Sequence, residues 1–127
     1  YGMYFLEICD YCTRENNDER ELLKLLYQSL RALGVPSLPR KLVRYIFEIR
    51  TVVINGEFPG LPDASQYQES TCYAVSHIVS APLGKLYTFA VSGQVLEELG
   101  KLADNYRKYS LDTAFKSLEI LEMFSVS

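Results

Sequence analysis

The sequence is poor in the residues that mark disulfide-rich, metal-held and membrane-spanning proteins. It has three cysteines and one histidine in 127 residues, and three cysteines without regular spacing do not describe a disulfide framework. No apolar run reaches the roughly 18 residues that a membrane span needs. No basic and apolar leader is present either. These features predict a protein of the reducing cytoplasm that spans no membrane.

The sequence also lacks an excess of positive charge. Thirteen Lys and Arg face sixteen Asp and Glu, which gives a net charge of −3. A domain that holds nucleic acid on its own is usually basic, so any such contact is expected to be local or to lie elsewhere in a longer protein. The length fits one domain, and the apolar content of 48% suffices for a core without metal or disulfide.

Residues that could carry thiol or metal chemistry are few. Cys9 and Cys12 form one Cys-x-x-Cys pair, whereas a structural zinc site usually needs two. The other candidates, Cys72 and His77, are five residues apart on one expected helix. We interpret the paired cysteines as buried thiols and His77 as a partly buried residue bonded to a carbonyl. A thiol enzyme or metal protein that uses these four residues is the less favoured alternative, and we expect no cofactor and no catalytic residue.

Apolar residues recur at helical spacing along most of the chain, which predicts an all-α fold, a compact bundle of about six helices. Ser37 and Ser92 are candidate caps for the helices that follow them, and Asn55-Gly56 is expected to end the helix 39–56. The broad apolar face of that helix predicts a central place with neighbours on more than one side. Leu23 and Leu30 are expected on the buried face of 18–33, and Tyr73 on that of 70–80. Residues 57–69 carry turn formers and are expected to form a surface loop. The expected helices cover about 2–12, 18–33, 39–56, 70–80, 92–109 and 111–124, with a further helical turn in 83–89.

One helix start breaks a local rule. Arg40, Lys41 and Arg44 place three cations in the first turns of the expected helix 39–56, where the helix dipole is already positive. Such conflicts gather at functional sites, and a positive helix start with basic side chains suits an anion. These residues are therefore candidate anion ligands. The alternative is a solvated basic end that neighbouring acids neutralise.

A second basic group lies towards the end of the chain. Two of its members are one heptad apart and share a helix face. They are possible contacts to DNA, although the more conservative interpretation is that they complement helix ends and nearby acids. The group comprises Lys101, Arg107, Lys108 and Lys116.

Several segments together resemble the C-terminal helical domain of the bacterial RecO family, over nearly the whole chain, 1–127. No single motif carries the resemblance; the order and spacing of the segments do. Tyr1 to Tyr11 resembles the helix that follows the family's oligonucleotide-binding barrel, and Arg44 to Gly56 resembles its central helix. The later segments are Glu69 to Ile78, Lys85 to Phe89 and Phe115 to Leu118. Because helical spacing begins at Tyr1, we expect the chain to be part of a longer protein.

The resemblance implies a non-enzymatic mediator of DNA repair and recombination in the bacterial cytoplasm, at the nucleoid. Members of the family anneal single strands, work with RecR and help to load RecA. Their helical domain is associated with the acidic, hydrophobic C-terminal tail of single-stranded DNA-binding protein. Such a tail needs cations for its carboxylates and an apolar pocket for its terminal aromatic residue. Arg40, Lys41 and Arg44, beside Tyr45 and Phe47, would supply both.

Two departures from the family pattern matter. Many relatives carry a four-cysteine zinc module after the central helix, but residues 57–69 contain no cysteine, so we expect a plain loop and no bound metal. The barrel is absent from this sequence, and with it the main surface for single-stranded DNA. An auxiliary DNA-binding surface on the helical domain is the alternative function.

Overall fold

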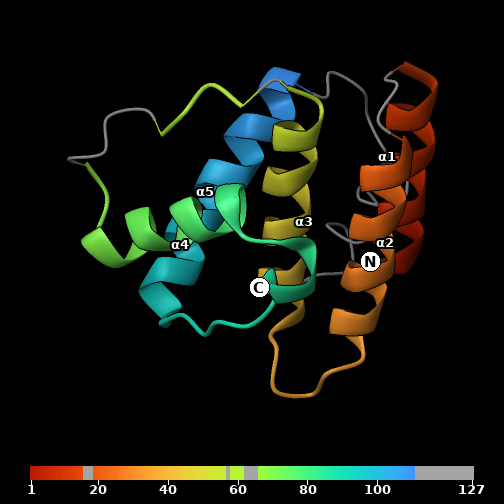
Figure 1. The fold of residues 1–127 in the computed structure, drawn as a ribbon. Helices are drawn as coiled ribbons and strands as arrows, with labels where there is room; N and C mark the ends of the chain where they lie inside the picture. The colour runs from red at the N-terminus through yellow and green to blue at the C-terminus, as the bar shows by residue number, and fades with distance from the viewer. Residues whose placement is uncertain (16–18, 57, 62–65, 111–127) are drawn as a thin grey trace.

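The computed structural model of the chain describes residues 1–15, 19–56, 58–61 and 66–110, and Figure 1 shows helices joined by turns and loops. No strand occurs in these ranges, so the predicted all-α class is confirmed. The expected helix over 111–124 lies outside the described residues. No helix within the described ranges is long and apolar enough to cross a membrane. The elements are α1 (Gly2–Glu15), α2 (Glu19–Leu33), α3 (Arg40–Ile54), α4 (Glu69–Ser80), the 3-10 turn η2 (Leu83–Lys85) and α5 (Gly93–Ser110).

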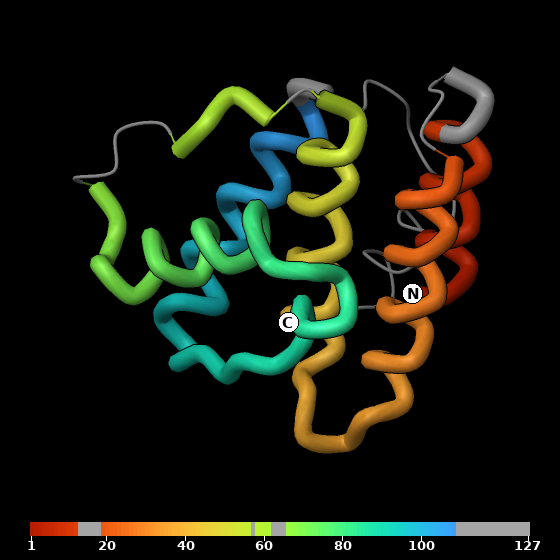
Figure 2. Tube along the Cα trace, viewed as in Figure 1, coloured from red at the N-terminus to blue at the C-terminus, as the bar shows by residue number. Residues whose placement is uncertain are grey.

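Helix α3 lies in the middle of the molecule, with α1 and α2 on one side and α4 and α5 on the other (Figures 1 and 2). It packs against α2, α4 and α5. This position explains its broad apolar face, since a helix with neighbours on several sides must bury more than one stripe. Eight of its fifteen residues are buried, which confirms the central place that the sequence predicted.

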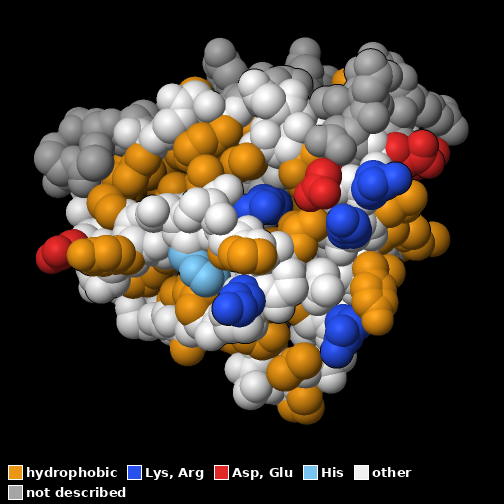
Figure 3. Space-filling model, in the orientation of Figure 1, with side chains coloured by type: hydrophobic (Ala, Val, Ile, Leu, Met, Phe, Trp, Pro, Cys, Tyr) orange, Lys and Arg blue, Asp and Glu red, His pale blue; other side chains and the backbone are white. Residues whose placement is uncertain are grey.

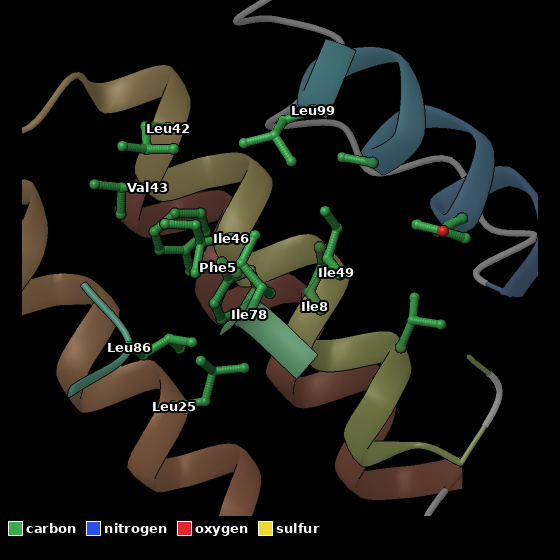
Figure 4. Close-up of a cluster of buried hydrophobic side chains, with 14 of the residues drawn as sticks. Phe5, Ile8, Leu25, Leu42, Val43, Ile46, Ile49, Ile78, Leu86 and Leu99 are labelled. Atoms are coloured by element: carbon green, nitrogen blue, oxygen red, sulfur yellow. The ribbon is translucent and has the colours of Figure 1, made fainter. Parts of the chain in front are cut away.

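The core forms where these helices meet (Figure 4). The Phe5 ring of α1 stacks on the Phe47 ring of α3, with 4.2 Å between their centroids. Both rings are fully buried, and aromatic pairs of this kind add about 1 kcal/mol beyond the area that they bury. Other fully buried side chains close the space between the layers: Ile8, Leu25, Val43, Ile46, Ile49, Ile78, Leu86 and Leu99.

Two helix ends follow the local signals in the sequence. The hydroxyl of Ser92 accepts a hydrogen bond from the backbone N–H of Val95 at 3.3 Å, as expected of a capping serine before α5. Helix α3 ends at Asn55, and Gly56 follows with φ of +75°. That left-handed conformation favours glycine, so the predicted Asn-Gly ending is confirmed.

Helix α4 is instead held at both ends by its neighbours. At its start, the Glu98 carboxylate of α5 accepts hydrogen bonds from the Gln68 backbone N–H at 3.1 Å and from the Thr71 hydroxyl at 3.0 Å. At its end, the Arg50 guanidinium of α3 donates to the carbonyls of Ile78 and Val79 at 2.9 and 3.0 Å. Tertiary contacts thus satisfy groups that a short helix leaves unpaired.

The predicted apolar faces of α2 and α4 need correction. On α2, Leu23 and Leu30 were expected inside but are exposed, whereas Leu25 and Ser29 are buried. The reason is that α2 packs on both α1 and α3, so its buried stripe follows Leu22, Leu25, Ser29 and Ala32. On α4, Tyr73 was expected inside but is 71% exposed.

Only part of the expected loop 57–69 is described. Residues 58–61 leave the end of α3 without regular structure (Figure 2). Phe58 packs its ring against Tyr106 of α5 at 5.1 Å between centroids, and the Tyr106 hydroxyl donates to the carbonyl of Gly60 at 2.9 Å. This stretch is therefore fastened to the helical body.

Candidate docking groove between helices α3 and α5

The basic start of α3 has the character that the sequence predicted. Pro39 is the N-cap, no side chain caps the helix, and its first turn contains no acid. Pro39 precedes the helix, which begins at Arg40, and Ser37 is not the cap that it was expected to be. Arg40 is exposed and Lys41 is half-buried. The free amides of this helix end are thus accompanied by cations, an arrangement that attracts anions.

A groove runs beside this helix start, between α3 and the first half of α5. Its volume is about 460 Å³. Lys41, Arg44 and Tyr45 line it from α3, and Lys101 lines it from α5 together with Leu96, the two glycines Gly93 and Gly100, and two acids, Glu97 and Asp104. The groove therefore combines three cations with an apolar strip, although two carboxylates reduce its positive charge.

Tyr45 and Gly100 set the shape of the groove. A Cβ atom at position 100 would lie 2.9 Å from the Cζ and Oη atoms of Tyr45, which is closer than such atoms normally come. The absence of a side chain at Gly100 thus lets the hydroxyl end of the tyrosine ring come close to α5. The Arg44 guanidinium lies over the same ring, 5.6 Å from its centroid, in a cation–π contact.

Arg44 also takes part in a buried ionic cluster below the groove. Glu48 is only 1% exposed; its Oε1 lies 3.4 Å from Arg44 Nε, and its Oε2 lies 3.7 Å from Arg107 Nη1. The Tyr4 hydroxyl donates to the same carboxylate, and Arg107 also pairs with Asp104. The cluster therefore joins α1, α3 and α5 through one buried acid.

The electrostatics of the cluster reflect both burial and pairing. Burial raises the pKa of Glu48, while Arg44, the Tyr4 hydroxyl and Arg107 oppose that rise. Burial lowers the pKa of each guanidinium, but the attraction of Glu48 and other neighbours outweighs it, so the pKa of Arg44 and that of Arg107 are raised. Burial, reinforced by Glu48, likewise raises the pKa of the Tyr4 hydroxyl. Both arginines therefore stay charged.

Some of the predicted site residues lie together in the groove, and others lie outside it. Lys41, Arg44 and Tyr45 lie together, and Lys101, expected only as a DNA contact, joins them from α5. Arg40 lies on the helix start outside the groove lining. Phe47 must be withdrawn from the site, because it points from α3 into the core and is fully buried against Phe5.

The second basic group is also divided by the fold. The Arg107 side chain is only 12% exposed and pairs with Glu48 and Asp104, which agrees with the conservative interpretation that it complements nearby acids and not with a surface contact to DNA. Lys108 is exposed, and its Nζ lies 2.9 Å from Asp104. Lys108 therefore also complements a nearby acid, as the conservative interpretation expected. Lys116 lies outside the described residues.

The cysteines and the histidine have the surroundings expected of structural residues. Cys9 and Cys12 are buried in the core, and burial raises the pKa of the Cys9 thiol to about 12. Cys72 is half-buried on α4. The imidazole of His77 lies 3.1 Å from the carbonyl of Lys85 and meets the Phe89 ring edge-on, as the conservative interpretation predicted. Across the part of the chain that the structure describes, no three His, Cys, Asp or Glu side chains could hold a metal ion.

Glu48 is a residue of the cluster that helical periodicity and capping signals do not identify. Its signal is a single carboxylate inside an apolar run, Ile46 to Ile49, four residues after Arg44. A charged residue on a buried helix face requires a buried partner. The sequence could thus have indicated an internal ion pair with Arg44, although not the partner from α5.

The described residues form an all-helical domain with a groove that cations, acids and apolar side chains line together. The family model for the C-terminal part of recombination protein O matches residues 1–66, just over half of the chain, and the chain belongs to this RecO C-terminal family. It is 32% identical over 59 residues to the DNA repair protein RecO of Acetivibrio thermocellus. That match covers 46% of this chain and only 24% of the relative, about a quarter of its length. No solved structure matches the chain.

Proposed function

We propose that this chain is the helical part of a non-enzymatic recombination mediator, and that its α3–α5 groove receives the acidic C-terminal tail of single-stranded DNA-binding protein. In the same proposal, the mediator acts with RecR in the annealing of single strands and in the loading of RecA. Membership of the RecO family supports the mediator role.

One observation supports the groove as the docking site. Lys41 and Lys101 come from different helices and lie on the lining of one hollow whose apolar part contains Tyr45 and Leu96. A tail of carboxylates that ends in an aromatic residue needs cations at the rim and an apolar surface between them. Asp104 opposes this less than its charge suggests, because Arg107 and Lys108 already pair with it.

The proposal is tested by titrating a fluorescein-labelled acidic peptide that ends in phenylalanine. Lys41→Glu and Lys101→Glu each replace an attraction at the groove by a repulsion, so each should weaken binding about tenfold at low salt. Lys85→Glu changes an exposed lysine on η2, outside the groove lining, and is the matched control. Circular dichroism checks that every variant is folded.

Two results would count against the groove. The first is equal affinity for wild type, Lys41→Glu and Lys101→Glu. The second is a loss as large in Lys85→Glu, since binding would then follow net charge and not a site. A peptide that lacks its terminal phenylalanine separates the contribution of the cations from that of the apolar strip. Its binding should be weaker, because the strip is no longer filled, but should still weaken as salt is added.

A further inference from the structure

A second hollow, which we call the α4 cleft, lies between α4 and the segment that joins η2 to α5 (Figure 1). Its volume is about 420 Å³, and none of its lining residues belongs to the groove. Figure 3 shows hydrophobic side chains around the histidine, which is pale blue. The cleft is lined from α4 by Ser70, Tyr73, Ala74 and His77, and from the joining segment by residues 89–92.

The joining segment has the geometry of a β-strand. Residues 88–92 form no helix, turn or bend, so the chain runs nearly straight there. Phe89 and Val91 are half-buried and pack on the core, whereas the residues on either side of each are exposed. Such alternation is typical of an extended chain, whose successive side chains point to opposite faces.

The backbone of this segment is available for pairing. Within the part of the chain that the structure describes, the N–H and C=O groups of residues 89–91 take part in no hydrogen bond. Four consecutive residues line the cleft although their side chains alternate, which places the cleft along an edge of the segment. The N–H and C=O groups of an extended chain point to its edges, and an unpaired edge is a template for a further strand.

The segment is fixed at both ends. Just before it, the Tyr87 hydroxyl lies 2.5 Å from the Ser29 hydroxyl of α2. At its start, the Thr88 hydroxyl donates to the carbonyl of Lys85 at 2.6 Å. At its end, Ser92 caps α5. Because both ends are held, the segment has little conformational freedom to lose when a partner binds, which favours association.

The α4 wall of the cleft matches the segment in length. Ser70 to His77 spans about 10 Å at 1.5 Å per residue, and Phe89 to Ser92 spans about 10 Å at 3.3 Å per residue. The rings of His77 and Phe89 meet edge-on with 4.8 Å between their centroids, and Tyr73 is 71% exposed beside them. The cleft thus places an unpaired backbone edge opposite a wall with aromatic side chains.

We propose that the α4 cleft binds an extended, uncharged segment of a partner protein, which pairs with residues 89–91 as an added strand. In this mode of recognition, backbone hydrogen bonds hold the peptide and neighbouring hollows select its alternate side chains. The described residues that line the cleft include no Lys, Arg, Asp or Glu, so a charged side chain would lose its hydration there without gaining an ionic partner. Apolar and aromatic side chains suit the rings of Tyr73, His77 and Phe89.

Nuclear magnetic resonance of the ¹⁵N-labelled 127-residue chain tests the proposal. The probe is an acetylated and amidated heptapeptide in which threonine alternates with valine around a central phenylalanine, added up to about 2 mM so that weak complexes are detected. The amide signals of residues 89–91 and of α4 should shift.

Two modified peptides test whether the backbone of the probe pairs. One has N-methyl groups on its threonines, and the other has them on its valines and phenylalanine. Successive N–H groups of a strand point to opposite edges, so one modified peptide should bind as well as the original and the other at least about tenfold more weakly.

Tyr73→Ser and Tyr27→Ser are a matched pair of variants. Both tyrosines are exposed, but Tyr27 lies on α2, outside the cleft lining. Both changes are at the surface and should retain the fold. Tyr73→Ser should weaken binding of the unmodified peptide several-fold, whereas Tyr27→Ser should leave it unchanged.

Four results would overturn the proposal. The first is an unmodified peptide that shifts no signal. The second is equal affinity of the two methylated peptides, since backbone pairing would then not occur. The third is an equal loss in the two tyrosine variants. The fourth is a shift at residues 89–91 that grows with protein concentration alone, because a second copy would then occupy the edge. The acidic peptide titration with Lys41→Glu and Lys101→Glu is independent of all four.

Discussion

Replacing Arg107 by methionine tests the buried cluster that joins α1, α3 and α5. The substitution keeps an apolar side chain of similar length and removes the guanidinium, whose Nη1 lies 3.7 Å from Glu48 Oε2. Both partners are largely buried, with 12% and 1% of their side chains exposed. Glu48 retains Arg44 and the Tyr4 hydroxyl in the variant, so the acid loses one partner of three.

The expected loss of stability follows from the distance between Arg107 and Glu48. At an effective dielectric constant of about 20, unit charges 3.7 Å apart attract by roughly 4 kcal/mol. The variant avoids the cost of burying the guanidinium, but it leaves a buried carboxylate with less compensation, and breaking such pairs typically costs 3–5 kcal/mol. Because Arg44 remains, we expect a loss of about 3 kcal/mol in the free energy of unfolding. That is a large part of the about 5–15 kcal/mol typical of a domain.

Urea denaturation followed by circular dichroism measures this loss, and about 3 kcal/mol corresponds to a midpoint lower by roughly 1–2 M. Lys108→Met is the matched control: it also removes a cation that pairs with Asp104, but Lys108 is 70% exposed, so the change should stay below about 0.5 kcal/mol. Equal losses in both variants would refute the role assigned to the buried pair.

The difference in stability between wild type and Arg107→Met should also depend on pH. Burial raises the pKa of Glu48 above its ordinary value of 4.5. At a pH above this raised pKa the carboxylate is charged, and the loss of Arg107 has its full effect on stability. As the pH falls through the raised pKa, the folded protein takes up a proton at Glu48, and the attraction to Arg107 disappears. The difference between wild type and Arg107→Met should therefore shrink towards acid pH and grow as the pH rises.

Three further predictions concern other parts of the molecule. Gly100→Ala should displace the Tyr45 ring, whose nearest atoms would lie 2.9 Å from the new Cβ, and so lower the affinity for the acidic peptide several-fold. The free energy of unfolding, measured in urea, should change little, because a gain in helix propensity of up to about 1 kcal/mol offsets the steric crowding. Cys72 should react with a thiol reagent in the folded protein well before Cys9, whose pKa burial raises to about 12; equal rates would contradict this. Glu98→Gln should weaken the two hydrogen bonds at the start of α4 and lower the free energy of unfolding by about 1–2 kcal/mol, whereas an unchanged urea midpoint would argue against that capping role.

The sequence alone determined the helices and most of their ends. Helical periodicity and capping residues act within one or two turns, so they can be read without knowledge of the fold. The cap at Ser92 and the Asn55-Gly56 ending were correct for this reason. The buried stripe of α2 was wrong, because the face that a helix buries depends on which neighbours cover it. The helix expected over 111–124 stays a prediction.

Only the tertiary structure decided which basic residues are buried and which line the groove. The sequence treated Arg44 and Arg107 as surface cations, but folding places both beside the buried acid Glu48. It also brought Lys101 of α5 into the groove that contains Lys41 of α3. Glu48 and Arg107 are 59 positions apart in the chain, and Lys41 and Lys101 are 60 positions apart. Periodicity and capping carry no information about such pairings, because the pairs form only when whole helices pack.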